Sequence, residues 1–157
     1  MPGTSIPVGL KQLYNIQGLF VQAGWLSLLF AVFWQQALIG AYVCVLAIGL
    51  VYISALAFGG RLDPESPAIS VKSFFSLPGV IGLLQNRRAA FASWTHILVF
   101  DLLVGTLIVL DSNAADITGW LVIPCLFLTL MFGPAGFVAY VVLRISIFGI
   151  PTFLMPW

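Results

Sequence analysis

The most informative stretch of the sequence is WTHILVFDLLVG at residues 94–105. It lies in an apolar run from Ala89 to Leu110, which as a helix rising about 1.5 Å per residue can cross a bilayer core of about 30 Å. The stretch also holds the single histidine of the chain, His96, and a carboxylic acid, Asp101. An ionised acid at the centre of a membrane helix costs roughly 2.5–3.5 kcal/mol, so we expect Asp101 to face other helices and to have a partner or a proton.

The composition predicts an integral membrane protein. Of 157 residues, 61% are apolar and 7% are charged, whereas soluble domains average about 25% charged residues. The net charge is +1 and the six basic residues are scattered, which leaves no basic face for a nucleic acid. Cys44 and Cys125 lie in separate apolar runs without further ligands nearby, so we expect no metal site and no redox chemistry.

The apolar runs predict a single all-α domain, a four-helix transmembrane bundle, with spans at residues 16–34, 37–58, 89–110 and 119–143. The break between the first two spans is only a few residues long, which predicts an antiparallel hairpin. Residues 68–84 are apolar but are interrupted by Lys72 and Pro78. We expect that segment to lie on the membrane interface between the second and third spans.

The basic residues then predict a topology. With four spans, Lys11, Arg61, Lys72, Arg87, Arg88 and Arg144 all fall on one face of the membrane. The positive-inside rule makes that face cytoplasmic, or stromal in a plastid, and places both termini there in a multi-pass protein.

Helical geometry separates the two ionisable groups of the central stretch. Asp101 follows His96 by five residues, which is about 7.5 Å along the axis and leaves the side chains about 140° apart. They either flank a ligand that lies across the helix or face two different neighbours. Pro134 has no N–H, so the Leu130 carbonyl loses its helical donor and becomes a candidate acceptor for a protonated Asp101. That pairing is either structural or part of a functional carboxyl site.

Other polar residues admit two interpretations. Gln17 and Gln22 in the first span are either packing contacts between helices, the commoner case, or polar groups that line a site. Asp111 and Asp116 follow the third span and are expected to be solvated loop or cap residues.

Three segments resemble a known family. They are Trp94-x-His96-x4-Asp101-Leu102-x2-Gly105, then Ile108-Val109-x-Asp111-Ser112, then the run IPCLFLTLMFGPAG at residues 123–136. Together they resemble the neoxanthin synthase family, small membrane proteins also known by the abscisic-acid-deficient plant phenotype. The first fifteen residues are neither Arg-rich nor Ser-rich, as a transit peptide would be. We therefore expect a bacterial or cyanobacterial member in an inner or photosynthetic membrane.

The resemblance implies an isomerisation of a carotenoid. Plant members are required to convert violaxanthin to neoxanthin, in which a 5,6-epoxide opens to an allenic alcohol. One group protonates the epoxide oxygen and another removes a proton from the polyene, so no redox cofactor and no metal are needed. Asp101 is then the expected acid and His96 the expected base. The expected substrate-binding wall consists of Trp94, Phe100, Gly105, Phe132, Gly133 and Pro134.

An alternative uses the same surfaces without catalysis. The chain would then be a carotenoid-binding or accessory subunit of a larger pigment–protein complex, in contact with carotenoid and membrane lipid. A transporter would need a polar path through the membrane, and one central acid among four helices offers little of one.

Overall fold

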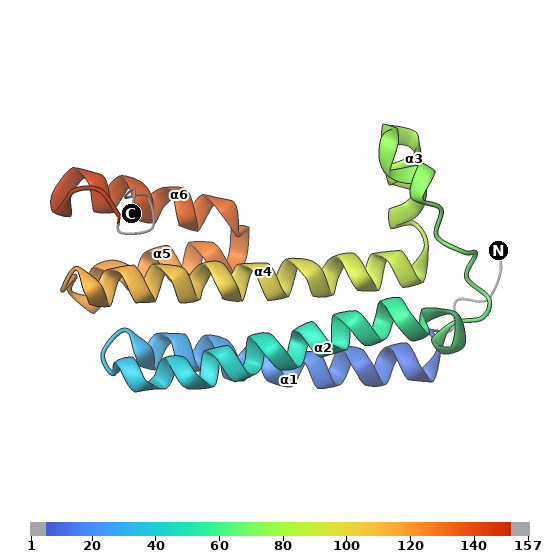
Figure 1. Cartoon of the computed structure of the whole chain (residues 1–157), viewed down its shortest axis with the longest axis horizontal. Coiled ribbons are helices and arrows are strands. Elements are labelled where there is room, and N and C mark those ends of the chain that lie inside the picture. Colours follow the sequence, from blue (N-terminus) through green and yellow to red (C-terminus); the bar gives the residue numbers. More distant parts are fainter. Residues whose placement is uncertain (1–5, 152–157) are drawn as a thin grey trace.

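The structure, a computed structural model, describes residues 6–151, and within that range it contains helices and no strand. The elements are α1 (Val8–Ala31), η1 (Gln35–Ala37), α2 (Leu38–Leu62), η2 (Val71–Phe75), α3 (Leu77–Leu84), α4 (Arg87–Ala114), α5 (Gly119–Phe132), α6 (Pro134–Leu143) and η3 (Arg144–Phe148). The long helices α1, α2 and α4 run side by side, and α5 and α6 pack along one half of α4 (Figure 1). The all-helical prediction is confirmed.

The first two long helices form the antiparallel hairpin that the short polar break predicts (Figure 1). The Ser27 hydroxyl in α1 donates to the Ala37 carbonyl at 2.5 Å and fastens the turn. α1 begins at Val8, earlier than the predicted start of the first span at Ile16. Pro7 precedes the first helical residue, a place where its fixed φ suits a helix start and its missing N–H is not needed.

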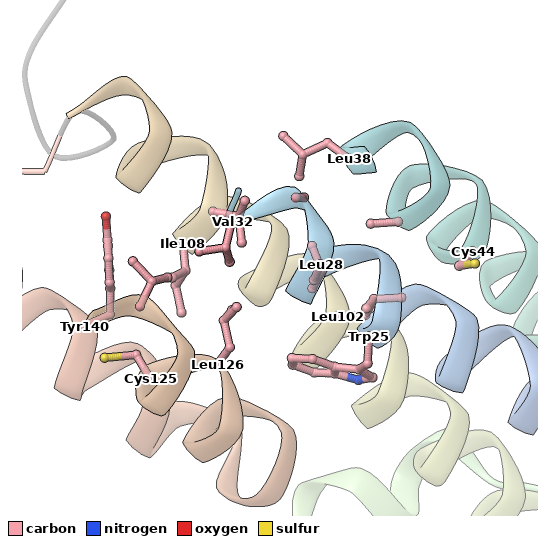
Figure 2. Close-up of a cluster of buried hydrophobic side chains, with 14 of the residues drawn as sticks. Trp25, Leu28, Val32, Leu38, Cys44, Leu102, Ile108, Cys125, Leu126 and Tyr140 are labelled. Atoms are coloured by element: carbon pink, nitrogen blue, oxygen red, sulfur yellow. The ribbon is translucent and has the colours of Figure 1, made fainter. Parts of the chain in front are cut away.

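Helix α4 is the central element of the bundle. It starts at Arg87 because the Asn86 side chain caps it and accepts hydrogen bonds from the backbone N–H groups of Arg88 at 3.0 Å and Ala89 at 3.3 Å. Its 28 residues make it about 42 Å long. The core lies where α4 meets α1, α2 and α5, and Figure 2 shows Leu28, Leu102 and Ile108 in it, all completely buried.

The last apolar run is a helical hairpin, which corrects the single helix predicted over residues 119–143. α5 ends at Phe132, Gly133 takes a φ of 46°, and α6 runs back beside α5 (Figure 1). The two arms approach closely because Gly136 has no side chain, and a Cβ there would collide with the backbone of Thr129. With 14 and 10 residues, the arms are about 21 Å and 15 Å long, so neither crosses a bilayer core of about 30 Å.

The hairpin also corrects the predicted distribution of charge. Arg144 forms an ion pair with Asp111 at 2.9 Å. Asp111 follows Arg87 by 24 residues of α4, so the two residues are separated by about 36 Å along the helix axis. Arg144 therefore lies at the end of α4 opposite to Arg87, and the prediction that all six basic residues share one face is wrong.

The segment between α2 and α4 projects from one end of the bundle (Figure 1). It contains η2 and the short helix α3, and neither includes a buried residue. The Ser76 hydroxyl caps α3 by accepting a hydrogen bond from the Gly79 N–H at 3.2 Å. The segment therefore lies outside the helical bundle. Its position on a membrane interface stays a prediction.

Two helical segments, Gln35–Leu62 and Arg87–Ala114, are long and apolar enough to cross a membrane. Within the most apolar 18 residues of each segment, only 28% and 33% of the residues, respectively, are buried inside the protein. Large apolar side chains of α2 such as Leu46, Leu50 and Ile53 are exposed. Such surface supports association with a membrane, whereas four membrane crossings are not found among residues 6–151.

Candidate functional site

The Asp101 carboxyl lies against the turn between α5 and α6. A Cβ placed on Gly133 would lie 2.5 Å from Asp101 Oδ1 and 3.3 Å from its Cγ. Gly133 therefore meets two requirements at once, a positive φ that L side chains rarely adopt and room for the carboxyl group. Asp101 is half-buried, and no hydrogen bond joins its carboxyl group to any other residue in the described range.

The expected hydrogen bond from Asp101 to the Leu130 carbonyl is not present within residues 6–151. α5 ends at Phe132, so the Leu130 carbonyl belongs to the last turn of a helix and does not face a kink. The turn is closed instead by the Gly133 N–H, which donates to the Thr129 carbonyl at 2.8 Å. Asp101 thus approaches the glycine of the turn and not a freed carbonyl.

His96 lies in a different environment. Its ring centroid is 4.4 Å from that of Phe100 and 5.7 Å from that of Tyr52. It lines a cavity of about 350 Å³ between α2, the η2–α3 segment and α4, together with Leu56 and Phe74 among others. Of the two arrangements that the helical spacing allows, His96 and Asp101 therefore face two different neighbours.

The remaining residues of the predicted substrate wall do not form one groove. Gly105 packs on α1, where an added Cβ would lie 2.7 Å from the Leu28 side chain and 3.3 Å from the Trp25 ring. Phe132 is exposed at the end of α5, and Pro134 is exposed as the first residue of α6. Their roles in binding stay predictions.

Trp94 lines a second cavity, of about 490 Å³, between α1 and α4. Gln17 of α1 forms part of the same wall and is only 1% exposed. The Thr95 hydroxyl lies 2.7 Å from Gln17 Oε1 and 2.9 Å from the Phe91 carbonyl oxygen. Gln17 Nε2 is buried and has no hydrogen-bond partner among the described residues, which costs about 1–3 kcal/mol for a neutral group.

A buried polar cluster that the sequence did not predict fastens α6 to α4. The Tyr140 hydroxyl donates to Asp111 Oδ2 at 2.6 Å, and Arg144 Nε donates to the same oxygen at 2.9 Å. Arg144 also donates to the Gly149 carbonyl at 3.0 Å. Asp111, expected to be a solvated cap, is 2% exposed, and Tyr140 is completely buried. The only available sequence signal was an acid and an arginine at the ends of apolar runs.

At the other end of α4, a second ionic cluster joins it to the end of α2. Arg87 donates to both carboxylate oxygens of Asp63, at 2.9 and 3.0 Å, and to Glu65 at 3.1 Å. Arg88 donates to the Ser66 carbonyl oxygen. In the part of the chain that the structure describes, no three histidine, cysteine or acidic residues are grouped so that they could hold a metal ion.

The family model described as ABA DEFICIENT 4-like matches residues 12–140. The chain belongs to this family. No curated protein and no solved structure matches it.

Membership of the ABA DEFICIENT 4-like family confirms the resemblance to neoxanthin synthase at the level of the family, and it suggests a role related to carotenoids or xanthophylls. The matched residues include Gln17, Asp101 and the Gly133 turn, and they end just before Arg144. The expected bacterial origin and the catalytic roles of Asp101 and His96 stay predictions.

Proposed function

We propose that this ABA DEFICIENT 4-like protein opens a carotenoid 5,6-epoxide to an allenic alcohol inside the membrane, with Asp101 as the acid. One observation carries the proposal, the carboxyl group of Asp101 held within an apolar helix beside Gly133 and without a hydrogen-bond partner in the described range. A carboxylic acid in such surroundings is least costly in its neutral form, which is also the form that donates a proton.

The proposed reaction needs only proton transfers. The Asp101 hydroxyl donates its proton to the epoxide oxygen while the bond between that oxygen and one ring carbon breaks. A proton then leaves the polyene carbon next to the ring, and the electron pair of its C–H bond forms the second double bond of the allene. Atoms and electrons balance because the product is an isomer of the substrate.

We assign the second proton transfer to Asp101 as well. After the first step Asp101 is a carboxylate, a suitable base, and the proton that it takes up restores the acid for the next turnover. The distribution of side chains supports this choice over His96, because the His96 ring packs with Tyr52 and Phe100 on another side of α4. A substrate that reached both groups would have to wrap around the helix.

The same separation favours a second candidate function. A carotenoid-binding or accessory subunit of a pigment complex needs apolar surfaces but no acid–base pair. In this case the exposed apolar faces of α2 and α4 would contact pigment and lipid, and Asp101 would only pack against the Gly133 turn.

Pigment analysis distinguishes the two functions. The gene is expressed in cells that make violaxanthin but no neoxanthin, and carotenoids are separated by chromatography with mass detection. The proposal predicts a new pigment with the mass of violaxanthin and an allenic end group. An unchanged profile with carotenoid bound to the purified protein would favour the accessory subunit, and an unchanged profile without bound carotenoid would exclude both.

A further inference from the structure

Arg88, in the first turn of α4, is a cation without a carboxylate partner. Its Nη2 donates to the carbonyl oxygens of Ser66 and Pro67, the latter at 2.6 Å. The acidic residues at this end of the bundle are paired with the neighbouring Arg87 instead, and no carboxylate among residues 6–151 lies within 4 Å of the Arg88 nitrogens. The positive charge of Arg88 is therefore bonded to neutral carbonyl groups only.

The guanidinium group of Arg88 offers one of its nitrogens to a ligand. Neither Nε nor Nη1 has a partner in the described range, and of the two only Nε is buried, so Nη1 keeps accessible surface. Arg88 lines a cavity of about 170 Å³ together with Gly59 and Gly60 at the end of α2. A Cβ on Gly60 would lie 3.3 Å from Nη1, so the absence of a side chain there leaves room beside this nitrogen. An arginine can only donate, and its best partner is an anionic oxygen.

An apolar groove continues from this cavity. The cavity of about 350 Å³ between α2 and α4 shares Leu56, Ile69 and Ala92 with it, so the two cavities adjoin. The wall of the larger cavity includes His96, which follows Arg88 by eight residues, about 12 Å along α4. The combined groove has a cation at one end and mostly apolar side chains beyond it. This distribution fits a molecule with an anionic head and an apolar tail.

The position of Arg88 on α4 corresponds to the level of lipid head groups. α4 is long and apolar enough to cross a membrane, and a bilayer that takes up its apolar part leaves the first turn among the phosphates. Basic residues outnumber acidic ones at this end of the described bundle, with Lys11, Arg61, Lys72, Arg87 and Arg88 against Asp63 and Glu65. Such an excess of basic residues attracts anionic lipid.

We propose that Arg88 binds the phosphate of an anionic phospholipid, whose acyl chain lies in the groove between α2 and α4. Arg88 precedes Asp101 by 13 residues, about 20 Å along α4, so the site is separate from the carboxyl group of the proposed reaction. The lipid would also bridge the bundle and the segment between α2 and α4, because Ile69 and Phe74 of that segment form one wall of the groove. Free phosphate shares the chemistry of the head group but would leave the apolar part of the groove unfilled.

Lipid binding by the purified full chain in detergent tests the inference. Native mass spectrometry gives the dissociation constants of dioleoyl phosphatidylglycerol, which is anionic, and of dioleoyl phosphatidylcholine, which has the same chains and no net charge. We expect phosphatidylglycerol to bind more tightly and an equal concentration of inorganic phosphate not to displace it. Equal affinities for the two lipids would overturn the inference, and so would displacement by inorganic phosphate.

Three variants locate the site. Arg88→Gln should weaken the binding of phosphatidylglycerol about tenfold, because a hydrogen bond to a charged group is lost. Arg88→Lys keeps the charge and should keep the preference for phosphatidylglycerol. Arg61→Gln removes a charge from the same end of the bundle at an exposed position that lines neither cavity, so it should change the affinity little.

Two outcomes of the variants would contradict the site. A folded Arg88→Gln protein that binds phosphatidylglycerol as tightly as the wild type would exclude Arg88 as the ligand of the phosphate. An Arg61→Gln protein weakened as much as Arg88→Gln would show a general attraction to the basic end of the bundle and no defined site. The comparison of the two lipids needs no variant, so it tests the inference even if Arg88→Gln does not fold.

Discussion

Arg144 Nε lies 2.9 Å from Asp111 Oδ2, and both side chains are almost completely buried, at 5% and 1% exposure. Two charges leave water at a cost of several kcal/mol each, which only close contact and further hydrogen bonds can offset. The Tyr140 hydroxyl and the Gly149 carbonyl supply such bonds. This cluster requires α6 to return to the end of α4 from which α5 starts, so it stabilises the hairpin that brings Gly133 to Asp101.

The first prediction concerns topology. Single cysteines are introduced at the exposed residues Glu65, Ala114 and Ser146 in a chain whose two buried cysteines are replaced by alanine. Because the hairpin returns, Ser146→Cys should react with a membrane-impermeant reagent from the same side as Ala114→Cys, and Glu65→Cys from the opposite side. If positions 65 and 146 react from the same side, the hairpin is contradicted and a single membrane-crossing helix at residues 119–143 is supported instead. The positive-inside rule predicts that position 65 is cytoplasmic.

The second prediction concerns the stability of the hairpin. Asp111→Ala leaves Arg144 buried without its carboxylate and should lower the free energy of unfolding by about 3–5 kcal/mol. The combined replacement Asp111→Leu with Arg144→Met removes both charges and should be less destabilising than Asp111→Ala. Asp116→Asn, at an exposed position, serves as the control. Thermal unfolding in detergent measures all three, and a combined variant less stable than Asp111→Ala would contradict the role of the buried charges.

The third prediction concerns pH. Burial raises the pKa of Asp63, but hydrogen bonds from Ser66 and Arg87 and the charge of Arg87 outweigh it and hold that pKa below the usual 3.8. A lowered pKa contributes stability that is complete above the ordinary value and is lost as the pH falls through the folded value. The thermal stability of the wild type should therefore fall below about pH 4.

Two variants test whether Asp63 causes this loss of stability in acid. Asp63→Asn should lower stability at neutral pH and reduce the further loss in acid. Glu65→Gln should change little, because the Glu65 side chain is 74% exposed and surface ion pairs contribute about 0–1 kcal/mol. If the Asp63→Asn variant loses as much thermal stability in acid as the wild type, other groups cause that loss.

The sequence predicted some of these features and missed others for physical reasons. The apolar runs identified α1, α2 and α4, because length and hydropathy are local properties. Pro134 predicted only a lost hydrogen bond within one last helix, because the return of α6 depends on tertiary contacts such as that between Arg144 and Asp111, more than 30 residues apart in the sequence. The commoner interpretation of Gln17, a packing contact between helices, agrees with its hydrogen bond to Thr95, but that partner could not be read from the sequence because it lies 78 residues away. Helical rotation predicted that Asp101 and His96 lie about 140° apart, but the choice between one shared ligand and two different neighbours came from the structure, where the His96 ring packs with Tyr52 and Phe100.

The fourth prediction concerns the turn at Gly133. Gly133→Ala introduces a Cβ at a positive φ and against the Asp101 carboxyl, so it should reduce the accumulation of folded protein in the membrane. Gly49→Ala provides the matched control, since a Cβ at Gly49 has no neighbour within 4 Å. Pro134→Ala should preserve the hairpin, because the positive φ belongs to Gly133. Normal accumulation and pigment conversion of Gly133→Ala would exclude the close contact between this turn and Asp101.

The role of Asp101 as the acid is tested by measuring the conversion of violaxanthin by the Asp101→Asn variant in the membrane. Asparagine keeps the size of the side chain and can donate a hydrogen bond, but it cannot give a proton to an epoxide. The protein should accumulate at the level of the wild type while the allenic product disappears, a loss of at least about a hundredfold for a general acid. His96→Gln should retain conversion. Allenic product formed at the wild-type rate by Asp101→Asn would contradict the assignment of Asp101 as the acid.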